Sequence, residues 1–374
     1  MQIIENSKVK EKLYIEKLKN GLTVMIIPKK DIQKKYIIWG THYGSNDSTF
    51  IVPGETQITE VPKGVAHFLE HKMFEQENGK NSLDVLTAIG VNANAYTTND
   101  HTAYLFECTD NFYPALDEFM DYVQHPYFTD ENVEKEKGII GQEIMMYDDY
   151  PEWKVYLNAL ESMYHNNPVK LDITGTIETI SKIDKDILYK CYNTFYNPSN
   201  MAMVIAGDFE PNELLEEIKK RLLDTAQNGE IKRIFEDEPE RIVKQKIEQD
   251  MNVSKPIFTI GIKCKVPNQN EKVRIHIAME IILNMLIGES SNLYKEMYQT
   301  GNIFAMPNLS YEFGDNYAHI LITENANNPE ILFERLREEI ESFKKNGLNE
   351  EDFERTKKMI YGEYVKEYND ATSI

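Results

Sequence analysis

Apolar and polar residues alternate in several segments of the chain and recur at helical spacing in others. On both sides of Asn20 and Gly21 the alternation predicts a β-hairpin, because Asn-Gly adopts the backbone angles of a tight turn. The remaining patterns of the first half predict further strands and helices. Strands are expected at 36–44, as two runs within 91–108 on either side of Asn99 and Asp100, and at 199–209. Helices are expected at 64–75, 111–123, 130–147 and 211–223.

A second series of elements follows a charged and poorly patterned stretch, 224–253, which we interpret as a linker. This interpretation divides the chain into a domain at 1–223 and a domain at 254–374. The second domain is expected to contain strands at 256–266 and around 318–324, and helices at 273–286, 329–343 and 350–368.

The two series resemble each other. Residues 128–144 and 348–364 align without a gap at an offset of 220 residues. Five positions of this alignment are identical; Glu131, Glu134, Lys137, Ile140 and Glu143 match Glu351, Glu354, Lys357, Ile360 and Glu363. Shared helical periodicity alone gives some matches, so the alignment suggests a duplication without proving it. We expect two homologous halves.

The first copy of this helix is followed by a long passage that ends with the strand through Phe209. At the same offset, the second copy of that strand would lie near residue 429, beyond Ile374. We therefore expect the second half to be truncated. A second copy that is simply shorter is the alternative.

The composition limits the possible functions. A chain of 374 residues with 41% hydrophobic and 28% charged residues is typical of a soluble globular protein. The formal net charge of -21 excludes nucleic acid as a favoured partner, because phosphates would be repelled. The same charge permits a basic peptide or protein partner, although an acidic surface also serves solubility alone.

The expected location is cytoplasmic, with no membrane contact. The three cysteines are isolated from one another, so they predict neither a disulfide framework nor a cysteine metal cluster. The first residues are charged and lack the apolar core of a secretory signal. No apolar run approaches the roughly 18 residues that a membrane span requires.

The stretch GVAHFLEHKMFE places His67, Glu70 and His71 on one face of the expected helix at 64–75. Two imidazoles one turn apart can bind a zinc ion, and a catalytic zinc site keeps one position for water. The glutamate between them then lies where a general base would act on that water. The alternative is an ordinary solvated helix with three polar residues.

Glu143 is a candidate for a third ligand. It follows His71 by 72 residues and is flanked by Ile139, Ile140 and Ile144, and burial of an unpaired carboxylate is costly. Glu136 lies two helical turns earlier on the same face. Taken alone, two glutamates on a helix also fit a solvated face.

Together these residues resemble the insulinase/pitrilysin family, the inverted zincins with a His-x-x-Glu-His motif. The resemblance extends over nearly the whole chain and includes several further motifs in the family's order. They are GTHYGSND, NANAYTTNDHTAYLFE, GIIGQEI, NPVKLDITGTIETISKI and YNPSNMAMVIAGDF. The resemblance implies an α+β fold of two homologous halves, each a mostly antiparallel sheet covered by helices on one face. In that family only the first half holds zinc.

The resemblance also implies roles for individual residues. His67, His71 and Glu143 would bind one zinc ion per chain, and Glu70 would take the proton of the attacking water and pass it to the leaving amine. Glu136 would be a supporting carboxylate of the catalytic site. In NANAYT, the residues Asn94, Ala95 and Tyr96 would bind substrate by strand addition. A core strand with an Asn-rich turn is the alternative for this segment.

The chain departs from the family in its second half. Active members often carry an arginine and a tyrosine that hold the substrate carbonyl, and the matching positions here are Tyr298 and Phe304. Phenylalanine has no hydroxyl to donate. A homologous partner subunit, in a homo- or heterodimer, could supply the missing pair, as in some bacterial members of the family.

The expected function is that of a zinc-dependent endopeptidase that cleaves peptides or unfolded segments. Two alternatives remain from the residues alone. One is a non-catalytic scaffold that binds a homologous subunit, and an intact Glu70 counts against it. The other is a peptide-binding module with a structural zinc site.

Overall fold

The computed structural model describes residues 1–223, 225 and 229–373. Contacts between residues divide the chain into two compact units. Unit 1 comprises Met1–Ile144, Asp172–Ile234 and Val365–Ile374, and unit 2 comprises Met145–Leu171 and Phe235–Tyr364. Compactness thus assigns the segment Met145–Leu171 to the unit that holds most of the second half. The domain limits at 223 and 254 stay predictions, and positions 224 and 226–228 of the predicted linker lie outside the described residues.

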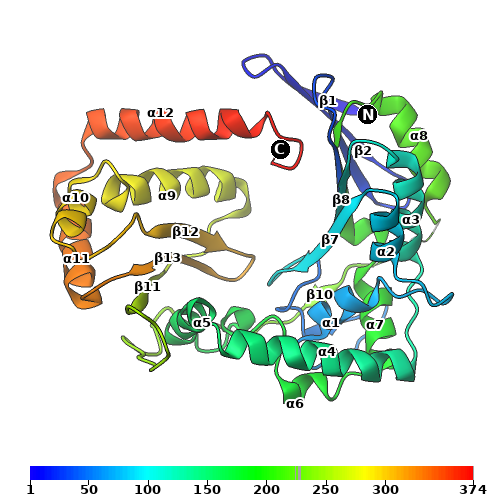
Figure 1. Ribbon diagram of the computed structural model, residues 1–374, viewed down its shortest axis with the longest axis horizontal. Coiled ribbons are helices and arrows are strands. Elements are labelled where there is room, and N and C mark those ends of the chain that lie inside the picture. The colour runs from blue at the N-terminus through cyan, green and yellow to red at the C-terminus, as the bar shows by residue number, and fades with distance from the viewer. Residues whose placement is uncertain (224, 226–228, 374) are drawn as a thin grey trace. The chain divides into compact units, whose positions relative to one another are not determined.

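Unit 1 is built on a seven-stranded sheet with the strand order β1-β2-β3-β9-β4-β8-β7 (Figure 1). Neighbouring strands are antiparallel except β3 and β9, which are parallel. The strands are β1 (Gln2–Asn6), β2 (Glu11–Lys17), β3 (Thr23–Pro28), β4 (Lys35–Thr41), β7 (Asn92–Thr97), β8 (Thr102–Cys108) and β9 (Met201–Gly207). A small sheet of β10 (Lys232–Arg233), β5 (Thr49–Ile51) and β6 (Thr59–Glu60) completes the strands of this unit.

Helices and one face of the seven-stranded sheet enclose the main core of unit 1. The helices of the unit are α1 (Val65–Lys72), α2 (Ser82–Ala88), α3 (Phe112–Gln124), α4 (Asp130–Asp148), α6 (Ile177–Ile180), α7 (Lys185–Phe195) and α8 (Pro211–Arg221). The last turn of α4, from Met145, belongs to unit 2. Among the described residues, the opposite face carries a small cluster that contains Ile27, Ala206 and Ala371. The expected arrangement, with helices on one face, is therefore confirmed.

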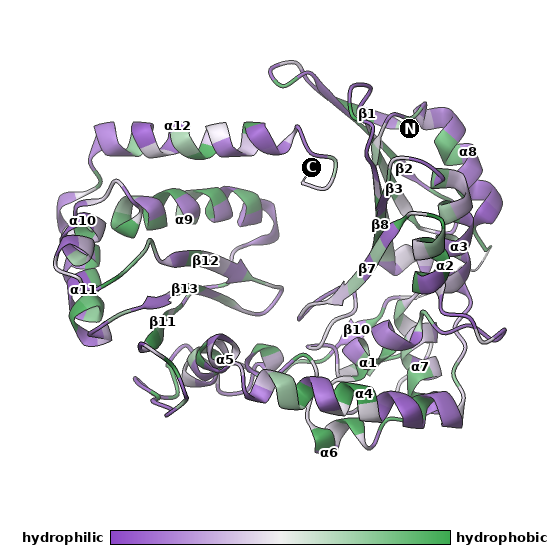
Figure 2. Ribbon diagram, in the orientation of Figure 1, coloured by the Kyte–Doolittle hydropathy of each residue, from purple (hydrophilic) through white to green (hydrophobic). Residues whose placement is uncertain are grey.

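Helix α8 shows how the sequence sets these elements. Pro211 begins the helix, where its missing N–H costs nothing, and three basic residues lie in the last turn at the negative end of the helix dipole. Leu214, Leu215 and Ile218 form its buried face. In Figure 2 the same helix is hydrophilic on its outer side. The predicted helix at 211–223 is thus confirmed, with its end two residues earlier.

The hairpin predicted around Asn20 and Gly21 joins β2 to β3, and Gly21 has the positive φ of 97° that the turn requires. Strand β1 was not predicted, because its sequence, QIIEN, shows no alternation of apolar and polar residues. All five of its residues are exposed in the structure. Within the described residues, no helix combines the length and the apolar character needed to cross a membrane.

Unit 2 contains an antiparallel sheet with the order β11-β13-β12. Its strands are β11 (Ile257–Lys263), β12 (Asn308–Phe313) and β13 (Ala318–Asn325). Its helices are α5 (Pro151–Met163), α9 (Lys272–Ile287), α10 (Asn292–Gln299), α11 (Pro329–Asn346) and most of α12 (Glu350–Glu367), whose end from Val365 belongs to unit 1. Apolar residues of α9, α10 and α11 form a core with this sheet. Short 3-10 turns lie at Pro168–Lys170, Pro198–Asn200 and Gln269–Glu271.

The two halves repeat one order of elements. In the first half β4 is followed by α1, α2, β7, β8, α3 and α4, apart from the small strands β5 and β6. In the second half β11 is followed by α9, α10, β12, β13, α11 and α12. The strand orders also correspond, since β4-β8-β7 matches β11-β13-β12. This shared topology confirms the expectation of two homologous halves.

Candidate metal centre

Helix α1 carries the candidate residues and is almost entirely buried. It begins after Gly64, whose φ is 92°, and a Cβ at this position would lie 2.5 Å from the carbonyl oxygen of Thr174. Only glycine fits this close approach of two backbone segments. His67 is 8% exposed and Glu70 is 7% exposed. The alternative of a solvated helix with three exposed polar residues is therefore wrong.

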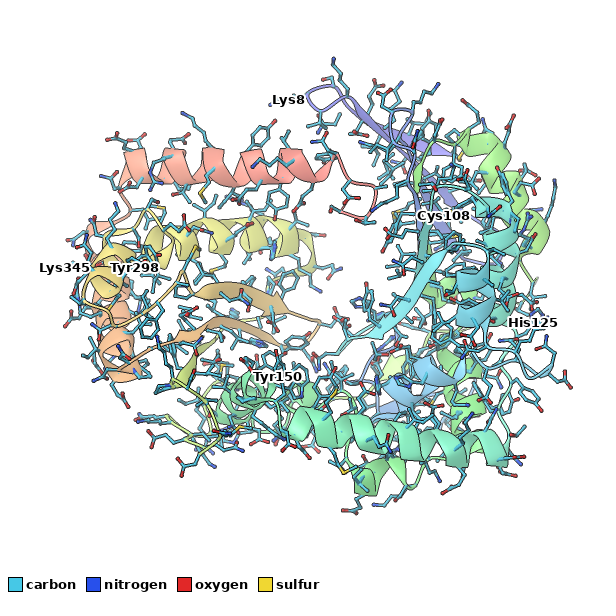
Figure 3. The ribbon with its side chains drawn as sticks, viewed as in Figure 1. Lys8, Cys108, His125, Tyr150, Tyr298 and Lys345 are labelled. Atoms are coloured by element: carbon cyan, nitrogen blue, oxygen red, sulfur yellow. The ribbon has the colours of Figure 1, made fainter. Side chains whose placement is uncertain are left out.

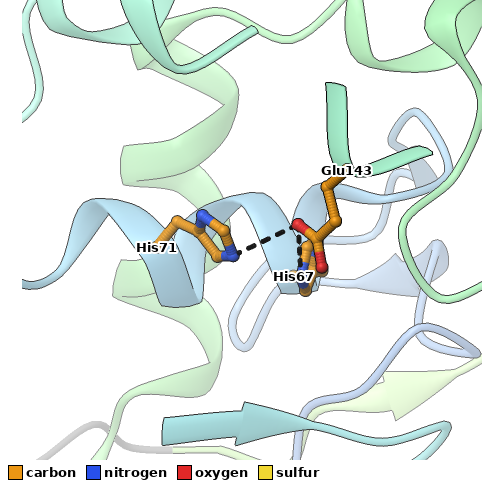
Figure 4. A group of neighbouring side chains, drawn as sticks. All are labelled: His67, His71 and Glu143. Atoms are coloured by element: carbon orange, nitrogen blue, oxygen red, sulfur yellow. Dashed lines mark ion pairs between the residues drawn. The ribbon is translucent and has the colours of Figure 1, made fainter. Parts of the chain in front are cut away.

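Helix α4 brings Glu143 to the two histidines. The Nε2 atoms of His67 and His71 each lie 3.7 Å from Oε2 of Glu143 (Figure 4). One ligand atom from each residue can be chosen so that all three lie within 4.8 Å of one another. Among the described residues, these three form the only group with such metal-binding geometry.

The hydrophobic residues of α4 explain its orientation. Ile140 and Ile144 are buried, as the sequence suggested for residues flanking Glu143, whereas Ile139 is exposed and contributes nothing to this environment. Glu136 lies on the buried face and Glu143 at its margin. The solvated-face alternative for these glutamates is wrong for Glu136, whose Oε1 lies 3.1 Å from Nδ1 of His71.

These residues fit a transition-metal ion. Ligand atoms at about 2.0–2.1 Å from a tetrahedral zinc ion lie roughly 3.3 Å from one another. The two separations of 3.7 Å between a histidine nitrogen and Oε2 of Glu143 need only a small contraction. Two imidazole nitrogens and one carboxylate oxygen are a zinc donor set, and three protein ligands leave one coordination position open.

The two histidines have different electrostatic environments. Burial lowers the pKa of His67 to about 3, so its imidazole is neutral, as a metal ligand must be. Burial alone would also lower the pKa of His71, but the hydrogen bond to Glu136 and the charges of three nearby glutamates raise it above its ordinary value. The Nδ1 atom of His67 has no hydrogen-bond partner among the described residues.

Glu70 lies beside the two histidines and keeps one hydrogen bond to the sheet. The hydroxyl of Thr97, the last residue of β7, donates to Oε2 of Glu70 at 2.9 Å. Burial raises the pKa of Glu70 despite this bond and the nearby charge of His71. A carboxylate whose pKa is raised toward neutrality is suited to proton transfer. Thr97 was missed by the sequence reasoning, although it lies directly after the predicted substrate residues.

Strand β7 contains Asn94, Ala95 and Tyr96 and lies at an edge of the seven-stranded sheet. It pairs with β8 on one side, and no described strand pairs with its other side. Asn94 and Tyr96 are exposed. The alternative of a core strand is therefore wrong, and the substrate role of the three residues stays a prediction.

Tyr298 and Phe304, the two second-half positions, belong to unit 2. Tyr298 is exposed on α10 (Figure 3). Its ring stacks on that of Tyr294, with the ring centroids 5.7 Å apart. Phe304 lies under the ammonium of Lys255, which is 3.1 Å from the ring centroid. Phe304 therefore has a cationic neighbour, but neither its ring nor Lys255 supplies a hydroxyl group.

Comparisons with known proteins agree with this geometry. Residues 50–177 match the family described as insulinase (Peptidase family M16), and residues 182–360 match the Peptidase M16 inactive domain. An uncharacterized zinc protease of Bacillus subtilis (strain 168) is 39% identical over 99% of this chain and 87% of its own length. A mouse protein, cytochrome b-c1 complex subunit 1, is 26% identical over 53% of this chain and 41% of its own length.

Solved structures show the same fold. The crystal structure of an M16-like peptidase from Alicyclobacillus acidocaldarius has a TM-score of 0.93 at 34% identity and covers 99% of this chain and 87% of its own. Pitrilysin has a TM-score of 0.72 at 16% identity and covers 94% of this chain and 39% of its own, which shows the fold alone. The family matches, the identity to the Bacillus relative and the repeated topology lead to one conclusion. The chain belongs to the insulinase/pitrilysin family.

Proposed function

We propose that the protein is a zinc-dependent endopeptidase with one zinc ion per chain. The observation that carries the proposal is the convergence of His67, His71 and Glu143 beside the buried carboxylate of Glu70. Two relatives from Bacillus subtilis are named as uncharacterized zinc proteases, and these names support the same reaction class.

In the proposal, His67, His71 and Glu143 hold the metal. Zinc, when bound, supplies a Lewis acid that polarises a carbonyl group and lowers the pKa of water. Glu70 acts as the general base that accepts a proton from the attacking water and delivers it to the leaving amine. Its buried position supports this role, because burial raises the pKa of the carboxyl group and so makes it a better proton acceptor.

Two neighbours hold these groups in place. Glu136 accepts the Nδ1–H of His71, which leaves Nε2 of the same ring for the metal. Thr97 fixes one oxygen of Glu70 and leaves the other for the reaction. Because Thr97 ends β7, the strand that we propose to bind substrate is mechanically linked to the general base.

The proposed substrate is an extended peptide that adds to the free edge of β7 through Asn94, Ala95 and Tyr96. Backbone hydrogen bonds along such an edge give affinity with little dependence on side chains. The strand has already used one donor, since the Ala95 amide donates to Oδ1 of Asn94 at 2.9 Å. Substrate binding therefore requires this side chain to rotate or to share the donor.

A second candidate function is that of a subunit that works with a homologous partner. Tyr298 and Phe304 favour it, because they lack the guanidinium group and the hydroxyl that active members use. The similarity to a cytochrome b-c1 complex subunit is consistent with assembly into a larger complex. In this case the chain would supply the zinc site, and its partner would supply the groups that hold the substrate carbonyl.

A peptide-library digest tests the proposal. The zinc content of the purified chain should be stoichiometric, and cleavage should stop when a chelator removes the metal and return when zinc is added. A chain that binds zinc but cleaves only in the presence of a homologous subunit would favour the second candidate. A chain without stoichiometric zinc would contradict both.

A further inference from the structure

Lys72 directly follows His71 on α1, and its side chain is only 1% exposed. Lysine is among the residues least often buried completely, because its ammonium group loses strong hydration. A lysine at the C-terminal end of a short helix would normally extend into solvent. The burial of Lys72 beside a candidate ligand therefore requires a local explanation.

The ammonium of Lys72 is bound between two carboxylates. It contacts Oε2 of Glu75, and it lies 3.6 Å from Oε2 of Glu136. The other oxygen of Glu136 accepts the hydrogen bond from Nδ1 of His71 at 3.1 Å. The two oxygens of Glu136 are thus divided between a lysine and a histidine that are adjacent in the sequence.

Without the ammonium group of Lys72, the ionised side chain of Glu136 would be less firmly fixed in its position beside His71. Glu70, Glu136 and Glu143 all act electrostatically on His71, so three carboxylates share one small region. Mutual repulsion would favour protonation of one of them or rotation of Glu136 away from the imidazole. The positive charge of Lys72, 3.6 Å from Oε2 of Glu136, acts against both changes.

The two histidines therefore differ in the hydrogen bonding of Nδ1, the ring nitrogen that does not face Glu143. Nδ1 of His71 is connected through Glu136 to Lys72, whereas Nδ1 of His67 has no hydrogen-bond partner among the described residues. The orientation of His71 depends on this connection, since the ring can otherwise present either nitrogen to the metal.

We propose that Lys72 is a positioning residue of the metal centre, and that its ammonium fixes Glu136 so that His71 presents Nε2 to the metal ion. The inference rests on the proposed zinc site and extends it to a residue that touches neither metal nor substrate. A purely structural role for Lys72 would affect the stability of the fold but not the properties of the bound metal.

The test compares Lys72→Met with Lys29→Met. Lys29 is a matched control, because it is also a largely buried lysine in unit 1. Its ammonium pairs with Glu11 and donates to the carbonyl oxygen of Tyr368, both away from His67, His71 and Glu143 in the sequence. Zinc affinity is measured by competition with a chromophoric chelator, and ligand geometry by the absorption spectrum of the cobalt-substituted protein. Melting of the metal-free variants reports on stability alone.

We expect Glu136→Gln to weaken zinc binding by about 10–100-fold, as is usual when the partner of a metal ligand is lost. Lys72→Met, which acts through Glu136, should weaken zinc binding by up to the same factor and change the cobalt spectrum. Lys29→Met should leave both unchanged. In the double variant Lys72→Met/Glu136→Gln, the loss should not exceed that of Glu136→Gln alone, because both changes interrupt one connection. Lys72→Gln, which keeps a hydrogen-bond donor without the charge, provides the same comparison if Lys72→Met does not fold.

Three results would overturn the inference while leaving the zinc site intact. They are wild-type zinc affinity with an unchanged cobalt spectrum in the Lys72 variants, an equal loss in Lys29→Met, and additive losses in the double variant. Failure of the wild-type protein to bind zinc would instead contradict the proposed function on which the inference rests.

Discussion

Helices α4 and α12 hold the same position in two copies of one order of elements, but only α4 contributes to a candidate metal site. At the offset of 220 residues, Ile140 and Ile360 are both buried, with exposures of 0% and 2%. Glu136 is replaced by Thr356, which is also buried, and Glu143 corresponds to the exposed Glu363. The apolar residue that holds the helix in place is shared, whereas the polar residues near it differ.

The difference shows that a glutamate on this helix can contribute to a metal site only if another element places histidine or lysine side chains beside it. Glu136 and Glu143 meet His67, His71 and Lys72, which all come from α1. The corresponding helix of the second half, α9, has a single histidine, His276, within a mostly apolar sequence. The duplication therefore preserves the packing, and the chemistry depends on the few polar residues added to it.

The largest expected effect is the loss of the metal in unit 1 when a ligand is removed. His67→Ala should abolish stoichiometric zinc binding, because removal of a ligand costs more than the roughly 10–100-fold that loss of a ligand's partner costs. His276→Ala, in the corresponding helix of the second half, should leave the zinc content unchanged. Metal analysis of the two purified variants checks this contrast, and an equal loss in both would break it.

The next effect concerns pH. The pKa of His71 is raised in the metal-free protein, so a proton competes with the metal above the ordinary pKa of histidine. Zinc affinity should therefore be greatest above that raised pKa and fall by about tenfold per pH unit below it. Titrations at several pH values measure the slope, and an affinity that is constant from pH 8 to pH 5 would contradict the assignment of His71.

A smaller effect is expected from Thr97→Val, which removes the hydrogen bond to Glu70. The bond stabilises the ionised carboxylate, so its loss should raise the pKa of Glu70 further and move the acidic limb of the kcat/KM profile to higher pH. The loss of a hydrogen bond to a charged group corresponds to about 1.5–3 kcal/mol. Thr259→Val, which interrupts a threonine pair in the second sheet, is the control and should leave the profile unchanged.

The smallest effect should be the same in both halves. Ile140→Val and Ile360→Val each remove one buried methylene group and should each cost about 0.5–1.5 kcal/mol of stability. Thermal melting measures the two values. A severe effect at one position and none at the other would show that α4 and α12 are not held by equivalent residues.

The sequence predicted the features that depend on local spacing. The helical positions of His67, Glu70 and His71 set their common face, and the turn at Gly21 required a positive φ. Features that depend on tertiary contacts were not predictable in the same way. A lysine after His71 suggests a solvated residue, and only the approach of Glu136 from α4 shows why Lys72 is buried.

The assignment of Met145–Leu171 to unit 2 also lies beyond local patterns. Its helix, α5, has an ordinary amphipathic sequence, and the sequence gives no sign of which core it joins. Tertiary contacts determine which core α5 joins, because its Leu160 and Met163 pack with Tyr317 and Leu321 of the second half. Such contacts link residues far apart in the chain, so no local periodicity encodes them.

The most direct test of the central claim is to compare Glu70→Gln with the wild-type protein, using Glu280→Gln on α9 as the control. The account predicts that Glu70→Gln keeps its zinc and loses about 10²–10⁴-fold in kcat for peptide cleavage. Glu280→Gln should keep both its zinc and its activity. Unchanged cleavage by zinc-loaded Glu70→Gln would contradict the claim that unit 1 contains a metallopeptidase site with Glu70 as its base.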